Sequence, residues 1–70
     1  MQNALSPAEY HIVQGVFRSL AQADWFDRSE ENEKECARLV LLMYSNGIGD
    51  ALQLHEACEP RARERFAKPQ

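Results

Sequence analysis

The sequence has no apolar stretch long enough to cross a membrane, since its longest apolar run is Leu39 to Tyr44. Residues 1–6 hold neither a positive charge nor an apolar run, so we expect neither a signal peptide nor a membrane anchor. Only two cysteines are present, Cys36 and Cys58, which are too few for a disulfide scaffold. Both lie within apolar patterns, where free cysteine behaves as a small buried hydrophobe. We therefore expect two reduced thiols and a cytoplasmic protein that makes no contact with a membrane.

Alternating apolar and polar runs are missing, β-branched residues are few, and the sequence has no internal repeat or low-complexity segment. The chain is 44% hydrophobic and 27% charged, which is typical of a folded globular protein. Its 70 residues form one domain, which we assign to residues 1–70 with frayed ends at 1–5 and 68–70. At this size folding buries only about 60% of the unfolded chain's surface, so a partner, a metal or a second copy would add stability.

The segment from Leu5 to Tyr10 carries several helix-start signals. Ser6 as N-cap, Pro7 at the first helical position and Glu9 three residues after the cap predict a capping box. Leu5 and Tyr10 occupy the two positions of a hydrophobic staple. In a helix over 7–23, one half is apolar: Tyr10, Ile12, Val13, Val16, Phe17, Leu20, Ala21 and Ala23.

A second helix is predicted over 28–46, with Asp27 or Ser29 at its start. Acidic residues crowd its first turns, where the helix dipole favours negative charge: Glu30, Glu31 and Glu33. The helix ends at Asn46, because Gly47 can adopt the positive φ of a C′ residue. Its core stripe consists of Cys36, Leu39, Val40 and Met43, widened by Ala37 and Tyr44.

A third helix is predicted over 51–67, with Asp50 as its N-cap and Gln53 as the capping-box partner. Its apolar stripe consists of Ala51, Leu54, His55, Cys58, Ala62 and Phe66. Pro60 has no N–H and clashes with the carbonyl of Glu56, so we expect a kink or break at Pro60 and a short last helix beginning there. The sequence therefore predicts an all-α fold, a small antiparallel three-helix bundle.

Leu41 and Leu42 fall outside the core arc of the second helix, and Leu42 lies on the same side as Arg38 and Ser45. In a monomeric bundle this side would face solvent. We therefore predict a homodimer whose two-fold axis crosses this helix, with Leu42 near the centre and Leu41 and Arg38 beside it.

Trp25 and Phe26 lie between two cap-forming residues, Asp24 and Asp27, which indicates a tight corner after the first helix. We interpret the pair as a hydrophobic plug whose rings fold back over the end of the bundle. The alternative is an exposed hot spot for a protein partner, because such aromatic residues also dominate interfaces.

A net charge of −3 argues against duplex DNA as the main partner, since nucleic-acid binders are usually basic. From position 60 onward, Glu64 is the single acid among the cations of a basic segment: Arg61, Arg63, Arg65 and Lys68. We interpret this basic segment as neutralising the acidic first turns of the second helix. The alternative is contact with RNA or an acidic partner, although so few charges meet too few phosphates for tight binding.

His55 and Cys58 lie one helical turn apart, and Cys36 lies on the facing stripe, so a three-ligand metal site is conceivable. Zinc sites normally show two pairs of closely spaced ligands, whereas this sequence offers one pair and no fourth ligand. We therefore favour a half-buried histidine beside two packed thiols, and we expect no metal and no cofactor.

The sequence offers no nucleophile with a base, no paired carboxylates in a cleft and no lysine after the glycines of residues 47–49. The would-be recognition helix of a helix-turn-helix, residues 51–59, has no Arg or Lys. We expect a non-enzymatic protein–protein interaction or regulatory module whose partner is another protein or a second copy. The alternatives are a nucleic-acid-associated regulator that uses the basic segment, and a metal or redox sensor.

Overall fold

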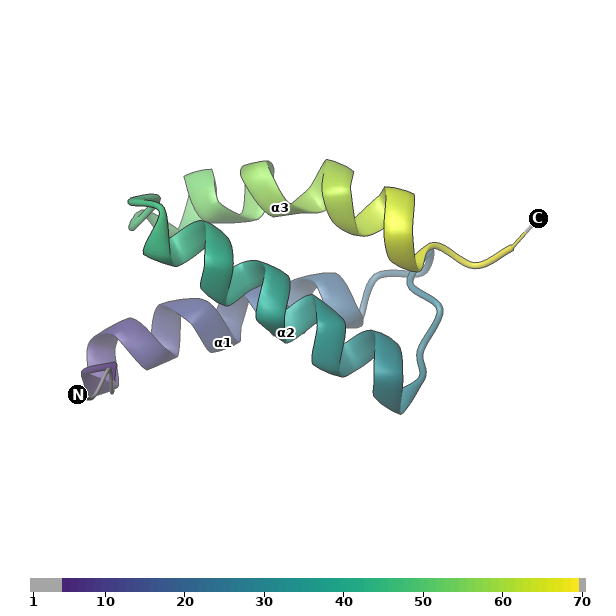
Figure 1. Cartoon of the computed structure of the whole chain (residues 1–70), viewed down its shortest axis with the longest axis horizontal. Coiled ribbons are helices and arrows are strands. Elements are labelled where there is room, and N and C mark those ends of the chain that lie inside the picture. The colour runs from purple at the N-terminus through teal and green to yellow at the C-terminus, as the bar shows by residue number, and fades with distance from the viewer. Residues whose placement is uncertain (1–4, 70) are drawn as a thin grey trace.

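The structure, a computed structural model, describes residues 5–69 and consists of three helices packed pairwise around one core (Figure 1). They are α1 (Pro7–Ala21), α2 (Glu30–Ser45) and α3 (Ala51–Phe66). Extended pairing within residues 5–69 is limited to one antiparallel bridge between Phe26 and Ala67. The three-helix bundle predicted from the sequence is therefore confirmed. None of these helices combines the length and the apolar character that a bilayer crossing requires.

The predicted N-cap residues of α1 and α3 are confirmed. The Ser6 hydroxyl accepts the N–H of Glu9 at 3.2 Å, and the Ser6 N–H donates to the Glu9 carboxylate at 2.9 Å, which completes the capping box. The side chain of Asp50 accepts the N–H of Gln53 at the start of α3, but within residues 5–69 the Gln53 side chain makes no return bond to the Asp50 N–H, so Asp50 is a cap without the predicted capping box. Gly47 follows α2 with φ +106°, as a C′ glycine does.

The corner between α1 and α2 is longer than expected, since it takes residues 22–29 out of the helices. The backbone of Asp27 already forms two other hydrogen bonds. Its N–H donates to the carbonyl of Phe66 at 2.7 Å, and its carbonyl accepts from the side-chain amide of Asn32 at 2.7 Å. Ser29 therefore caps α2, where its hydroxyl accepts the N–H of Asn32. Of the two start residues that the sequence allows, Ser29 is correct.

Pro60 does not end a helix. The expected break, with a separate last helix beginning at Pro60, is wrong, because α3 runs through Pro60 as one helix (Figure 1). The ring lies on the exposed side of α3. A continuous helix keeps Ala62 and Phe66 on the same buried stripe as Leu54. Burial of the Phe66 side chain alone is worth about 2 kcal/mol, which offsets much of the cost of an internal proline.

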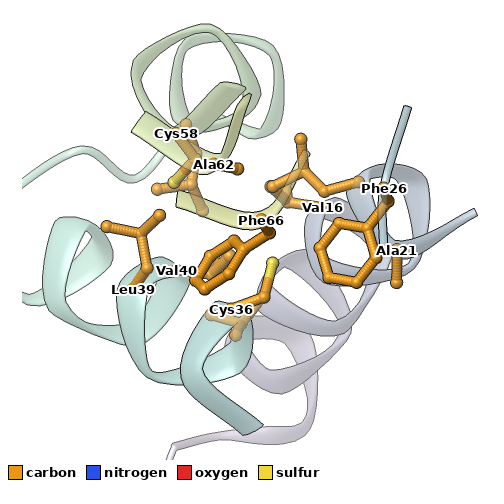
Figure 2. Close-up of a cluster of buried hydrophobic side chains, with 12 residues drawn as sticks. Val16, Ala21, Phe26, Cys36, Leu39, Val40, Cys58, Ala62 and Phe66 are labelled. Atoms are coloured by element: carbon orange, nitrogen blue, oxygen red, sulfur yellow. The ribbon is translucent and has the colours of Figure 1, made fainter. Parts of the chain in front are cut away.

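Among the residues that the structure describes, every buried core side chain is apolar (Figure 2). Its members are Val13, Val16, Leu20, Ala21, Phe26, Cys36, Leu39, Val40, Leu54, Cys58, Ala62 and Phe66. The rings of Phe26 and Phe66 lie 5.7 Å apart between centroids, at a tilt of 45° that suits an aromatic pair. These residues come from the three predicted stripes and from the corner after α1.

The Trp25-Phe26 corner closes one end of the bundle. Phe26 is only 2% exposed, so the plug interpretation is confirmed for this residue, while Trp25 is half-buried against the core. The N–H of Lys68 donates to the carbonyl of Trp25 at 2.8 Å, so residue 68 is held in place. At the other end, Leu5 packs against the core. The fraying expected at residues 1–4 lies outside the described residues.

Candidate interaction surface

The three candidate metal ligands are not brought together as a metal site. Cys36 and Cys58 are both fully buried as free thiols, while His55 is half-buried and has its Nδ1 atom 3.9 Å from Oε1 of Glu59. Within residues 5–69, no group of three or more His, Cys, Asp or Glu side chains could hold a metal ion. The geometry gives no support to a metal sensor.

Burial also makes the thiols poor nucleophiles. It raises the pKa of the Cys36 thiol to about 11, and the nearby Cys58 adds to the effect. Burial likewise raises the pKa of Cys58, against the opposing charge of Arg61. Since the thiolate is the reactive form, both cysteines are suited to packing rather than to redox chemistry at neutral pH.

The basic segment lies exposed on the last turns of α3 and beyond them. Nε of Arg63 lies 3.3 Å from a carboxylate oxygen of Glu59 on the same helix, and the Arg63 guanidinium covers the Trp25 ring. The guanidinium of Arg65 lies 5.7 Å from the ring of Phe66. Within residues 5–69 no ion pair joins this segment to the acids of α2, so direct neutralisation by ion pairing does not occur.

Within residues 5–69, four large apolar side chains are exposed. They are Tyr10 (56%), Leu41 (42%), Leu42 (57%) and Leu52 (67%). The sequence places Leu41 and Leu42 outside the core, and the structure agrees. Tyr10 is predicted on the apolar half of α1 but is exposed. It lies at the edge of that half, at a staple position near the helix end, and is covered on one side only. Leu52 is not among the surface residues predicted from the sequence, although it lies off the α3 stripe just as Leu42 lies off the α2 stripe.

Each pair of helices leaves a shallow groove. The α1·α2 groove has a volume of about 360 Å³ and is lined by Leu5, Tyr10, Val13, Gln14, Phe17, Ala37 and Leu41. The α2·α3 groove, of about 340 Å³, is lined by Glu35, Arg38, Leu39, Leu42 and Arg65. The α1·α3 groove, of about 420 Å³, is lined by His11, Ile12, Gly15, Val16, Ser19, Ala51, Leu52 and His55.

The two exposed leucines of α2 therefore belong to different grooves. Leu41 lines the uncharged α1·α2 groove, together with Tyr10. Leu42 lines the α2·α3 groove, where Arg38 lies 3.6 Å from Glu35 and Arg65 stands on the opposite helix. Between the two grooves, the outer side of α2 presents one ridge, which we call the α2 ridge: Arg38, Leu41 and Leu42.

No protein-family model matches this chain, and neither a curated protein nor a solved structure matches it.

Proposed function

We propose that this chain is a non-enzymatic interaction module that binds another protein chain through the α2 ridge and the adjoining α1·α2 groove. The observation that carries the proposal is the pair of neighbouring leucines, Leu41 and Leu42, exposed on a bundle whose core is complete without them. Tyr10 on α1 extends the same apolar surface.

The energetics favour a protein as the occupant. Each exposed leucine keeps apolar surface in water, and covering it would gain about 25 cal/mol for every Å² removed. Single exposed leucines are common on monomers, but here two neighbouring leucines are exposed, and one of them, Leu41, lines a concave, uncharged groove together with Tyr10. Tyrosine is also among the residues that contribute most to protein interfaces.

A binding module needs only an exposed apolar surface, whereas an enzyme also needs catalytic side chains. The α1·α2 groove contains no Asp, Glu, His, Cys or Lys side chain, and its single hydroxyl group, that of Tyr10, has no catalytic partner among the lining residues. Its lining is suited to packing against an apolar side chain.

The proposal is tested with a photo-crosslinking amino acid placed at Leu41 in the native cell. We expect an adduct of defined mass, formed with another protein or with a second copy. The same amino acid at Gln53, exposed at the start of α3, is the matched control and should give no such adduct. Equal labelling at both positions, or no adduct at Leu41, would contradict the proposal.

A further inference from the structure

We propose that the partner is a second copy of this chain, and that a two-fold axis lays the α1·α2 groove of one copy against the same groove of the other. This inference rests on the proposed function and names its partner. It moves the axis from Leu42, where the sequence predicts it, toward Leu41 and α1.

Charge selects this groove from the three. Near a two-fold axis, each residue lies close to the same residue and its neighbours in the other copy, so like charges would face each other. Glu35, Arg38 and Arg65 line the α2·α3 groove, whereas none of the residues lining the α1·α2 groove is charged. Depletion of charge is the compositional mark of an interface core. The α1·α3 groove contains no Asp, Glu, Lys or Arg, but two histidines line it, and Leu52 is its single exposed large apolar side chain, against Tyr10 and Leu41 here.

The lining residues of α1 are arranged symmetrically. They are Tyr10, Val13, Gln14 and Phe17, whose midpoint lies between Val13 and Gln14. Two antiparallel copies of α1 crossing at that midpoint place Tyr10 of each copy opposite Phe17 of the other. An aromatic pair of this kind contributes about 0.5–1.5 kcal/mol beyond the area that it buries.

The lining residues of α2 are complementary in size about their own midpoint. They are Ala37 and Leu41, centred on position 39. Antiparallel pairing about that point places the large Leu41 of each copy over the small Ala37 of the other, as a knob over a hole. Well-packed contacts of this kind match the density of a protein interior.

The two midpoints lie at the same height in the bundle. Tyr44 lies near Glu9: burial, and after it the negative charge of Glu9, raise the pKa of the Tyr44 hydroxyl. Moving about five residues inward from this contact, at 1.5 Å per residue along each helix, leads to Gln14 on α1 and Leu39 on α2. A single two-fold axis can therefore relate α1 to α1 and α2 to α2 of the second copy.

The available area is sufficient for such an interface. A stable interface buries about 800 Å² on each partner, or roughly one sixth of the 4954 Å² surface of this chain, and one of three bundle faces can supply that.

The test exchanges the knob and the hole. Sedimentation equilibrium at tens of micromolar should give a dimer for the unmodified chain. Leu41→Ala leaves a hole opposite a hole, and Ala37→Leu sets a knob against a knob, so each should weaken the dimer about tenfold or more. The double variant L41A/A37L restores one knob and one hole across the axis and should recover the dimer.

Leu52→Glu, at an equally apolar position of the α1·α3 groove, is the matched control and should leave the dimer constant unchanged. Helical circular dichroism checks that each variant folds. A monomeric unmodified chain would overturn the inference, whereas an adduct with a different protein at Leu41 would leave the proposed function standing. A dimer that Leu42→Glu disrupts but that the two single exchanges leave intact would also overturn it, in favour of the axis at Leu42.

Discussion

The guanidinium of Arg63 lies 5.0 Å from the centre of the Trp25 ring, which joins the last turn of α3 to the corner after α1. Two backbone hydrogen bonds join the same segments, from Lys68 N–H to the Trp25 carbonyl and from Asp27 N–H to the Phe66 carbonyl. The chain after α3 is therefore fastened across the end of the bundle, directly over the buried Phe26.

Replacing the ring of Trp25 tests this fastening. Trp25→Ala removes a half-buried aromatic side chain and should lower the free energy of unfolding by about 2 kcal/mol. Arg63→Gln should cost about 0.5 kcal/mol, since a cation–π contact whose guanidinium remains largely in water contributes little. Arg61→Gln on the same helix is the control and should not move the urea midpoint. An unchanged midpoint for Trp25→Ala would show that the corner does not stabilise the bundle.

The N-terminal cap of α1 makes a second prediction. Ser6→Ala removes the acceptor for the Glu9 N–H and should destabilise the fold by about 1 kcal/mol. Ser19→Ala, at an exposed interior position of α1, should leave stability the same or slightly higher, because alanine is the better helix former. Urea unfolding measures both, and equal midpoints for the two variants would contradict the prediction.

Helix starts could be predicted from the sequence because their chemistry is local. The cap Ser6 and its partner Glu9 lie three residues apart, as do Asp50 and Gln53, so no knowledge of the fold is needed. The C′ position of Gly47 is readable for the same reason.

Features that depend on distant contacts could not be predicted. The path of α3 through Pro60 follows from the burial of Ala62 and Phe66, which the local clash at Pro60 does not reveal. The late start of α2 follows from the bond between Asp27 and Phe66, residues far apart in the sequence.

The candidate surface was predicted in part. Helical periodicity alone places Leu41 and Leu42 outside the core. It does not say that they open onto different grooves, because that depends on where α1 and α3 lie around α2. The same limit explains why Tyr10 looked like a core residue: a wheel shows the direction of a side chain but not whether a neighbouring helix reaches it.

A third prediction contrasts two glycines. A Cβ added to Gly15, in the middle of α1, would meet no atom within 4 Å, so Gly15→Ala should raise the unfolding free energy by about 0.5–1 kcal/mol. Gly47 has equal space but a φ of +106°, so Gly47→Ala should lower stability by about 1 kcal/mol. Thermal melts that shifted in the same direction for both variants would contradict this reading of the backbone.

Charge reversal in the basic segment distinguishes the proposed interaction module from the alternative, a nucleic-acid-associated regulator. Replacing Arg61 and Arg65 by Glu should lower the urea midpoint slightly, because negative charges then lie near the C-terminal end of α3, where the helix dipole favours positive charge. RNA retention in a gel should stay at background for both the unmodified chain and the variant. Retention by the unmodified chain that disappears in the variant and falls with added salt would instead support a nucleic-acid regulator.

The last prediction concerns alkaline pH. Burial, with a smaller effect of Cys58, raises the pKa of Cys36 from its usual value of 9.0 to about 11. Between these two values the unfolded chain has lost the thiol proton while the folded chain retains it. Since the unfolded state then binds fewer protons, the unfolding free energy is unaffected by this group below pH 9 and falls as the pH rises toward 11. Tyr44, whose pKa is raised by burial and by Glu9, acts in the same direction. Urea unfolding at pH 8 and pH 10.5 should show the decline, and Cys36→Ala should reduce its slope. An equal slope in the two proteins would mean that Cys36 ionises as readily in the folded bundle as in the unfolded chain.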